Sequence, residues 1–287
     1  MNMLKEGKHW IFYKFSHFIQ IFYFFYLFSG CLIIYFETHF ILDQYYRIPY
    51  IRFFCIFLFI FGITSFFLCS LSDPGKISLN GLDKHLEYYS YDEIIFYTNT
   101  KCKTCNIIKP ARSKHCSYCS SCISRYDHHC FLLNNCIGGY NNMYYLVFLH
   151  IHIIITFYST YITFLTLYSI IIYEHLLEAT FINKENNEII PFSYLTIVNY
   201  LFYKCSGTFS LFVISIFSFF CLFFYFLHII YFSLFNNITQ NELTKYRKLE
   251  NNSGQINTEF YNKGFIKNVK DLLFYKKNIK NFIKKKL

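Results

Sequence analysis

The sequence predicts an all-α, multi-pass membrane protein with four transmembrane helices and a small cysteine-rich, two-zinc domain between helices 2 and 3. Of the 287 residues, 54% are hydrophobic and 23% are aromatic, more apolar ring mass than a soluble domain buries. Long runs of the chain are nearly free of charge and long enough to cross a bilayer. One polar segment between these runs collects seven of the twelve cysteines.

The apolar runs divide the chain into five parts. We expect, in order, a cytosolic N-terminus, transmembrane helices 1 and 2, a cytosolic cysteine-rich domain, transmembrane helices 3 and 4 with a lumenal loop, and a basic cytosolic tail: 1–14, 15–71, 72–142, 143–235 and 236–287. Within the first pair, the spans are expected at 15–36 and 52–71, joined by a loop over 37–51. No small-residue cleavage site follows the first run, so we expect it to remain as a span rather than act as a signal peptide.

Charge predicts the orientation. The tail from Asn236 to Leu287 holds twelve Lys or Arg residues against four Asp or Glu, whereas the loop between the last two spans is mildly acidic. Because positive charge stays on the cytosolic side, the N-terminus, the cysteine-rich domain and the tail are all expected there. The basic tail suits anionic lipid or a phosphorylated ligand, and nucleic-acid binding is not expected of so apolar a chain.

The cysteine-rich segment reads CKTCNIIKPARSKHCSYCSSCISRYDHHCFLLNNC over residues 102–136. Cysteine pairs two residues apart, with histidines at similar reach, are the pattern of tetrahedral zinc sites. Two closed sites need eight ligands, and the segment offers ten. Two knuckles, Cys102 with Cys105 and Cys116 with Cys119, begin the sites. Four further residues can complete them: His115, Cys122, His129 and Cys136.

The candidate ligands in excess of eight could carry out a chemical reaction. Asp127, His128 and Cys130 place a carboxylate, an imidazole and a thiol within four residues. A cysteine attacks as the thiolate, a histidine removes its proton, and a carboxylate fixes the histidine tautomer. The alternative, that Cys130 or His128 is itself a zinc ligand and no nucleophile exists, stays open on spacing alone. The thiol lies close before the third apolar run, where it would meet a long-chain thioester whose tail lies among the spans.

The segment resembles the cysteine-rich domain of the DHHC family of protein S-acyltransferases, or palmitoyltransferases. The likeness covers residues 102–141 and includes Asp127-His128-His129-Cys130 and Asn134-Asn135-Cys136. The four-span plan agrees with the family. Four residues outside the segment match its flanking motifs and are expected to give structural support: Asp73, Thr239, Glu242 and Asn268.

The resemblance implies a division of the ten candidates. The first zinc would take Cys102, Cys105, His115 and Cys122. The second would take Cys116, Cys119, His129 and Cys136. Asp127 would polarise His128, His128 would act as the base, and Cys130 would carry the acyl group as a thioester. The family works by ping-pong transfer from acyl-CoA, such as palmitoyl-CoA, to cysteines of protein substrates. Asn268 would pack the tail motif against the domain near the active site.

Three positions depart from the family pattern. Phe131-Leu132 stand where Pro-Trp usually follows the catalytic cysteine, beside the acyl path. Gln240 replaces the second threonine of a Thr-Thr-x-Glu motif, and Tyr145 stands where phenylalanine is common. None of these changes removes a zinc ligand or a member of the proposed triad. They leave an alternative function, a non-catalytic zinc-stapled membrane scaffold or adaptor.

We therefore expect a membrane protein S-acyltransferase of the Golgi or the ER, with its active site facing the cytosol. Its expected partners are membrane lipid, acyl-CoA and proteins with membrane-proximal cysteines. A transporter or channel has little support, because the spans carry almost no charge and offer no evident ion path.

Overall fold

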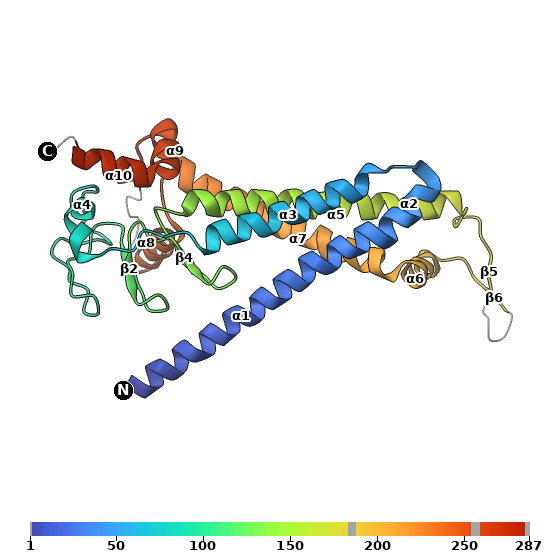
Figure 1. Cartoon of the computed structure of the whole chain (residues 1–287), viewed down its shortest axis with the longest axis horizontal. Coiled ribbons are helices and arrows are strands. Elements are labelled where there is room, and N and C mark those ends of the chain that lie inside the picture. The colour runs from blue at the N-terminus through green and yellow to red at the C-terminus, as the bar shows by residue number, and fades with distance from the viewer. Residues whose placement is uncertain (1, 183–187, 254–258, 285–287) are drawn as a thin grey trace. The chain divides into compact units, whose positions relative to one another are not determined.

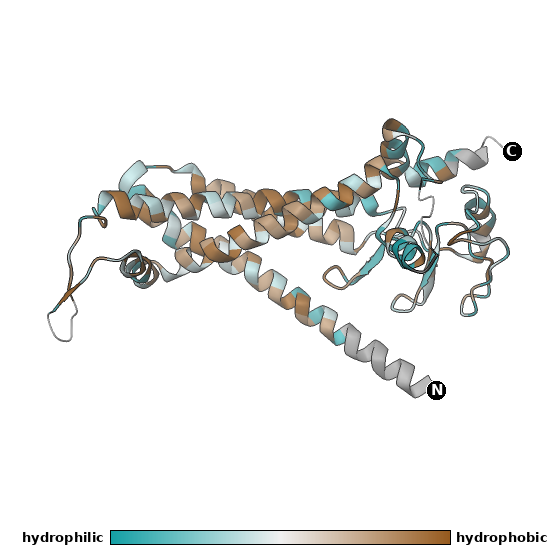
Figure 2. Cartoon of the chain, turned by 180° about the vertical axis from the view of Figure 1, so that it is seen from behind, coloured by the Kyte–Doolittle hydropathy of each residue, from teal (hydrophilic) through white to brown (hydrophobic). Residues whose placement is uncertain are grey.

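The structure is a computed structural model, and it describes residues 2–182, 188–253 and 259–284. Among these residues, four helical stretches are long and apolar enough to cross a membrane (Figure 1): Lys14–Tyr46, Tyr50–Ser70, Asn142–Tyr173 and Ser206–Phe235. Hydropathy colouring separates these brown helices from the teal cysteine-rich segment (Figure 2). The architecture is therefore mostly helical, as predicted, with the cysteine-rich region between the second and third spans.

The expected loop over residues 37–51 is wrong in extent. Helix α1 (Asn2–Leu32) continues through a π-helical turn, η1 (Ile33–Thr38), into α2 (His39–Tyr46), so the first span is longer than the apolar run. The helix ends at Arg47, which adopts a left-handed conformation with φ 45°, just before Pro49. Glu37 does not end the helix because its carboxylate has a partner, the backbone N–H of Thr208 at 2.9 Å.

The chain divides into two compact units, and the boundaries between them fall within the spans. One unit comprises residues 1–22, 65–149 and 224–287, and the other comprises residues 23–64 and 150–223. Each is described by itself, as unit 1 and unit 2. The helices that run through both are α1, α3 (Tyr50–Ser70), α5 (Asn142–Tyr173) and α7 (Ser206–Ile230).

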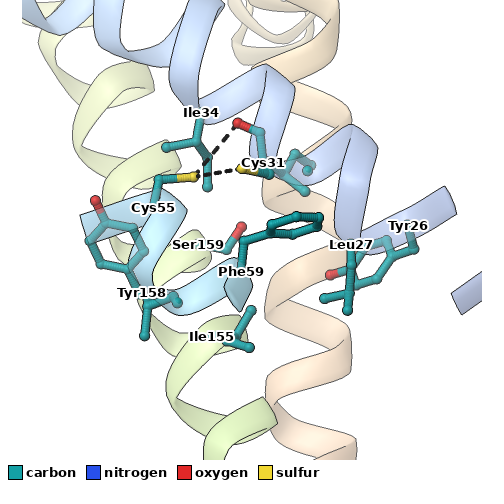
Figure 3. A pocket seen from close by; sticks show the side chains of 12 residues that line it. Tyr26, Leu27, Cys31, Ile34, Cys55, Phe59, Ile155, Tyr158 and Ser159 are labelled. Carbon is teal, nitrogen blue, oxygen red and sulfur yellow. Dashed lines mark hydrogen bonds between the residues drawn. The ribbon is translucent and has the colours of Figure 1, made fainter. Parts of the chain in front are cut away.

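Unit 2 is held together by apolar packing between helices. One core cluster contains Ile34, Leu42, Ile162 and Leu211, and Leu42 is fully buried. Beside this cluster lies a small pocket in which the thiols of Cys31 and Cys55 face each other with their sulfurs 3.5 Å apart (Figure 3). His152 is buried, and its Nε2 forms a 2.8 Å hydrogen bond with the Tyr23 hydroxyl.

The segment between the third and fourth spans was expected only as a loop. It contains a short hairpin, β5 (Phe181–Ile182) with β6 (Ile189–Ile190), and an eleven-residue helix, α6 (Tyr194–Lys204). Helix α6 stops one residue before α7 begins. The described part of unit 2 therefore carries a structured connection.

Unit 1 contains the cysteine-rich region, built on two antiparallel hairpins. The first pairs β1 (Lys114–Cys116) with β2 (Ser121–Ile123), and the second pairs β3 (His128–Cys130) with β4 (Asn135–Ile137). A short 3-10 turn, η2 (Leu79–Gly81), and helix α4 (Leu82–Leu86) precede them. The hairpins are too small to bury a core alone, and the buried clusters around them are made largely of cysteines with Ile77, Ile107 and Ile123.

The basic segment after the fourth span is helical rather than an extended tail. A π-helical turn, η3 (Tyr231–Phe235), ends the span. Three helices follow: α8 (Gln240–Ser253), α9 (Phe265–Leu273) and α10 (Tyr275–Lys284). Tyr261, in the turn before α9, and Tyr275 of α10 are buried and join Tyr89 and Phe96 in one aromatic cluster of unit 1. At Gly139 an added Cβ would lie 2.1 Å from the Tyr275 ring, so only glycine allows this approach.

Candidate active site and metal centres

Strand geometry decides which side chains of the two hairpins meet. Residues directly opposite each other on paired strands point to the same face, and successive residues of one strand point to opposite faces. His115 lies opposite Cys122, and His129 lies opposite Cys136. Each pair therefore offers an imidazole and a thiol to one point. Cys116, the neighbour of His115, points away from that histidine's face.

Two clusters of four ligand atoms result, and in each all four atoms lie within 4.8 Å of one another. The first contains Cys102, Cys105, His115 and Cys122, and the second contains Cys116, Cys119, His129 and Cys136. These are the same two sets that the family resemblance implies. The two clusters are interleaved in sequence because alternate residues of β1 serve different clusters.

The spacing within each cluster suits zinc. Zn–S bonds of about 2.3 Å and Zn–N bonds of about 2.0 Å in a tetrahedron put neighbouring ligand atoms about 3.5–3.8 Å apart. His129 Nδ1 lies 3.7, 3.5 and 3.6 Å from the sulfurs of Cys116, Cys119 and Cys136. His115 Nδ1 lies 3.2 Å from Cys105 Sγ and 3.9 Å from Cys122 Sγ. The clusters fit two zinc ions.

The three residues left over lie together at the start of the second hairpin. His128 and Cys130 share one face of β3, since they are two residues apart, and His129 between them points to the zinc cluster on the other face. His128 Nδ1 lies 2.7 Å from Asp127 Oδ2. That contact leaves Nε2 of the imidazole for the thiol. Asp127 is buried, whereas the His128 side chain is 26% exposed and so stays open to a reactant.

Electrostatics favours the charged form of this pair. Burial alone would lower the pKa of the His128 imidazolium, but hydrogen bonds with Asp127 and Cys130 raise that pKa to about 10. Burial raises the pKa of the Cys130 thiol, yet the hydrogen bond and the positive charge of His128 outweigh it and hold that pKa below its ordinary value. The backbone N–H groups of Leu133 and Leu132 act in the same direction. A thiolate beside an imidazolium is the nucleophilic form of such a pair.

The start of helix α8 holds Asp127 in place. Thr239 and Glu242 form a capping box: Thr239 Oγ1 accepts from the Glu242 N–H at 3.3 Å, and Glu242 Oε2 accepts from the Thr239 N–H at 2.9 Å. The N–H of Gln240, the first residue of α8, has no acceptor within the helix. It donates instead to Asp127 Oδ1 at 2.7 Å. Asp127 thus faces the N-terminus of α8.

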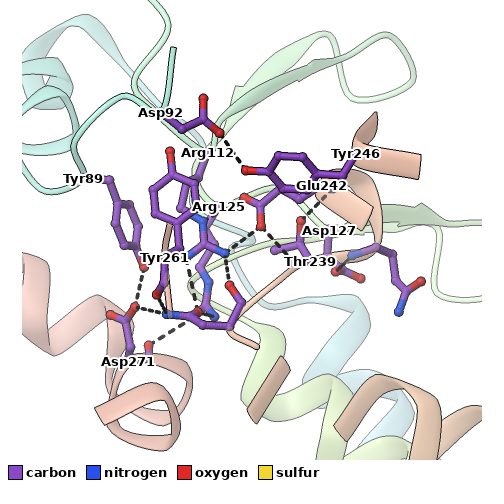
Figure 4. Close-up of polar contacts among 12 residues, drawn as sticks. Tyr89, Asp92, Arg112, Arg125, Asp127, Thr239, Glu242, Tyr246, Tyr261 and Asp271 are labelled. Carbon is purple, nitrogen blue, oxygen red and sulfur yellow. Dashed lines mark hydrogen bonds and ion pairs between the residues drawn. The ribbon is translucent and has the colours of Figure 1, made fainter. Parts of the chain in front are cut away.

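A buried ion network joins the capping box to the cysteine-rich region (Figure 4). Glu242 accepts two hydrogen bonds from Arg112, at 2.8 and 2.7 Å, and both side chains are fully buried. Asn237 Oδ1 accepts from Arg112 and from a second buried arginine, Arg125, at 3.2 and 2.7 Å. Asp271 has a pKa near 2 because Arg125 and the Tyr89 hydroxyl outweigh the effect of its burial. Sequence reasoning assigned no role to Arg112, Arg125 or Asn237.

The turn after Cys130 is anchored from both sides. Asn135 donates its side-chain amide to the carbonyls of Cys69, Ser70 and Ser72, at 3.3, 3.0 and 2.8 Å, and so caps the end of α3. The Ser70 hydroxyl donates to the Leu133 carbonyl at 2.7 Å. These contacts connect the hairpin that carries Cys130 to the end of the second span.

Phe131, one of the departures from the family pattern, packs its ring edge-on against its neighbours. Ring centroids lie 5.2 Å from Tyr118, 5.3 Å from His129 and 6.3 Å from Phe15. The Ser16 hydroxyl donates to the Phe131 carbonyl. Tyr145, another departure, stacks edge-on against His128 at 5.1 Å. The departures therefore fill space around the site without displacing a candidate ligand.

Two of the expected support residues, Asp73 and Asn268, hold backbone groups at the ends of spans. Asp73 Oδ1 accepts from the backbone N–H groups of Gly75 and Lys76, at 2.9 and 3.1 Å, which fixes the turn after the second span. Asn268 was expected to pack near the active site. Its amide donates to the carbonyls of Leu234 and Phe235, at 3.0 and 3.1 Å, and so anchors α9 to the end of the fourth span.

A pocket of about 110 Å³ lies beside the capping box and gathers positive charge. Lys109, Lys114 and Lys245 line it with aromatic rings, and Lys245 Nζ lies 4.6 Å from the centroid of the Phe96 ring. Within the described part of the chain, no carboxylate pairs with any of the three lysines. Burial lowers the pKa of Lys245, and the charges of Lys114 and Lys109 lower it further, while the carboxylates of Glu242 and Asp92 partly offset this decrease. The pocket is thus suited to an anion.

Comparison with known proteins agrees with this arrangement. A family model described as DHHC palmitoyltransferase matches residues 95–247, just over half of the chain. The chain is 35% identical to palmitoyltransferase ZDHHC4 of Rattus norvegicus over 88 residues, which are 31% of this chain and 26% of that protein. It is 44% identical to palmitoyltransferase SWF1 of Neurospora crassa over 93 residues, 32% of this chain and 22% of that protein. The match to swf1 of Emericella nidulans reaches 49% over 84 residues, 29% of this chain and 20% of the relative. The chain thus matches about a quarter or less of the length of these relatives. The chain belongs to the DHHC palmitoyltransferase family.

Proposed function

We propose that this protein is a protein S-acyltransferase that transfers a long-chain acyl group, such as palmitoyl, from acyl-CoA to cysteine thiols of other proteins. One observation supports it most: His128 and Cys130 share a face of β3, with Asp127 bonded to His128, and His129 points to a separate metal cluster. The site thereby keeps a nucleophile and a base free of the metal. A scaffold without turnover would have no need of that separation.

In the first half-reaction the Cys130 sulfur attacks the thioester carbonyl of acyl-CoA. The new S–C bond forms as the bond from the carbonyl carbon to the CoA sulfur breaks, and His128 passes the thiol proton to the leaving CoA thiolate. Asp127, held by the Gln240 N–H, keeps His128 in the required tautomer. The products are free CoA and an acylated Cys130.

In the second half-reaction a protein thiol takes the place of CoA. His128 removes the proton of the incoming thiol, the thiolate attacks the acyl-enzyme carbonyl, and Cys130 leaves and recovers the proton. The two half-reactions are chemically symmetric, since each exchanges one thioester for another. One base on one face of the hairpin therefore serves both steps.

The lysine pocket supports acyl-CoA as the donor. CoA carries phosphates on its head, and Lys109, Lys114 and Lys245 present three cations without a protein carboxylate as partner. The hydrogen-bond partner of the Lys114 ammonium is neutral: it donates to the side-chain oxygen of Asn241 at 2.9 Å. Its positive charge is therefore available to a phosphate. Asn241 follows Gln240, the residue that holds Asp127. We assign the phosphates of the donor to this pocket.

We assign the two metal clusters to structural zinc. Each offers four protein ligands and leaves no open position, the coordination of a zinc ion that stabilises a fold. Bound zinc would fix the two hairpins relative to each other, and the chain's own residues carry the acyl transfer. Positive charge on the cysteine-rich region and on the segment after the fourth span supports a cytosolic active site. We further propose that the protein resides in the Golgi or the ER membrane.

The test of the function is acyl labelling of purified protein with radiolabelled palmitoyl-CoA. We expect a hydroxylamine-labile label on the protein that Cys130→Ala abolishes. Cys221→Ala removes an exposed cysteine that lies outside the site and is the matched control, which should keep the label. Full labelling of Cys130→Ala would overturn the proposal, and absence of label in the unmodified protein would favour the scaffold.

The donor assignment has its own test. Lys245→Glu should raise the KM for palmitoyl-CoA about tenfold or more, because one lost ion pair with a phosphate contributes about 1.5–3 kcal/mol. Lys248→Glu, an exposed position three residues along the same helix and outside the pocket, is the control for charge alone. Equal KM values for the two variants would contradict the assignment.

A further inference from the structure

The connection between the third and fourth spans holds helix α6 in one orientation. Ile197 and Leu201, one helical turn apart, are buried in a core cluster with Leu167 and Ile170 of α5. The hydroxyl of Tyr200 donates to Glu174 Oε2 at 2.8 Å. Inward-facing residues thus fix α6 against the end of the third span.

The charged and hydroxyl groups where α6 meets the end of α5 bond to one another on the inward side of α6. Lys204, the last residue of α6, pairs with Glu174, and Tyr45 donates to the same carboxylate at 3.3 Å. Lys204 is the only charged residue of the helix. The outward face of α6 therefore carries no charge.

That outward face is uncharged and mostly apolar. Leu195, Val198 and Phe202, at spacings of three and four residues, lie on one stripe and are 67%, 42% and 47% exposed. Tyr194 and Tyr203 flank the stripe and are 77% and 85% exposed. A docked helix in water normally presents polar residues on its outer face, and this helix presents them only at Thr196 and Asn199.

Continuity with the fourth span identifies what covers this face. Only Cys205 separates α6 from α7, whose own outward residues Val213 and Phe217 are 50% and 71% exposed along a candidate membrane span. The apolar stripe of α6 therefore adjoins the start of a candidate membrane span in the chain. Eleven residues are too few to cross a bilayer, and tyrosines at both ends are typical of helices at the level of the lipid headgroups.

We propose that α6 is an interfacial helix that lies in the bilayer surface, with Leu195, Val198 and Phe202 inserted among the acyl chains. The partner of this surface is lipid. The adjoining hairpin supports it, since Ile189 and Phe192 are 71% and 50% exposed beside α6. The connection would then hold the third and fourth spans at a fixed depth, independently of the acyl-transfer chemistry.

Tryptophan fluorescence in nanodiscs tests the proposal, because the chain contains a single tryptophan, Trp10. In a Trp10→Phe background, Phe202→Trp gives a reporter on the stripe and Tyr97→Trp gives a control on an exposed loop of the cysteine-rich region. With phosphatidylcholine brominated on its acyl chains, we expect the reporter at 202 to lose most of its emission and to emit at shorter wavelength. The reporter at 97 should be quenched by aqueous iodide instead.

Two outcomes would overturn the proposal. Iodide quenching at position 202 without quenching by brominated lipid would place the face in water. Resistance to both quenchers, with concentration-dependent cross-linking of a cysteine introduced at position 198, would place it against a second copy of the chain. Leu195→Trp is a second reporter on the same stripe and must give the same answer as position 202.

Discussion

The two units of this protein are stabilised by different kinds of contact. In unit 1 the side chains meet at defined atoms: four ligands at each metal cluster, two oxygens of Glu242 on Arg112, and one N–H of Gln240 on Asp127. In unit 2 the main contacts are apolar, and buried residues such as Leu42 pack among other aliphatic side chains. Directional contacts fail when one atom is removed, whereas dispersion contacts tolerate a change of shape at constant volume. The units should therefore respond differently to small substitutions.

The largest effect is expected at the two adjacent histidines of unit 1. His129→Ala removes a ligand from the second metal cluster, and a structural zinc site contributes folding free energy of about 10 kcal/mol or more. We expect this variant to lose about half of its bound zinc and to unfold in the cysteine-rich region. Zinc content by atomic emission and protease resistance measure the two effects.

His128→Ala is the matched substitution one residue away. Because His128 lies on the other face of β3, this variant should keep its full zinc content and lose acylation of Cys130. A drop in zinc content for His128→Ala, or its retention in His129→Ala, would mean that the ligand sets are assigned wrongly.

The ligand sets illustrate how far sequence reasoning reaches. Spacing predicted ten candidate ligands for eight places but did not decide between them, and only the resemblance named the pair left over. The missing signal was the strand period: with β1 and β3 recognised as strands, alternate residues would fall to different faces. Three-residue strands between cysteines carry too few positions to show that period. The contact of Gln240 with Asp127 was beyond reach, because 113 residues separate the two and the donor is a backbone group.

A second prediction concerns that single backbone contact. Gln240→Pro removes the N–H that donates to Asp127 and the side-chain contact with His228, and it leaves the helix intact because proline is favoured at the first position of a helix. One lost hydrogen bond to a charged group is worth about 1.5–3 kcal/mol, so the rate of Cys130 acylation should fall about 10- to 100-fold. Single-turnover labelling measures the rate, and zinc content should not change.

Gln240→Ala separates the backbone donor from the side chain. It keeps the N–H and removes only the side-chain contact with His228, a 3.3 Å pair, so most of the rate should remain. Equal losses in the two variants would show that the side chain, and not the N–H, positions Asp127.

In unit 2 the sequence predicted the spans but not the end of the first span or helix α6. The apolar runs located the spans well, but the end of the first span was expected near Glu37 because charge was read as a helix boundary. The carboxylate lies inside the helix because the N-terminus of α7 supplies it with a backbone donor. Helix α6 was missed for a related reason, since its apolar residues face both the core and the outside and give no clean amphipathic period.

The smallest effect is expected where the comparison is most direct, at one aliphatic residue in each unit. Leu211→Met, beside the pocket of unit 2, conserves volume and should lower the free energy of unfolding by less than about 1.5 kcal/mol. Ile137→Met should cost more, because Ile137 is fully buried opposite His128 on β4, where a flexible, unbranched side chain must take the place of a stiff, β-branched one. Thermal unfolding in detergent gives both values as shifts in Tm. Equal shifts would mean that the helices of unit 2 pack as specifically as the zinc hairpins do.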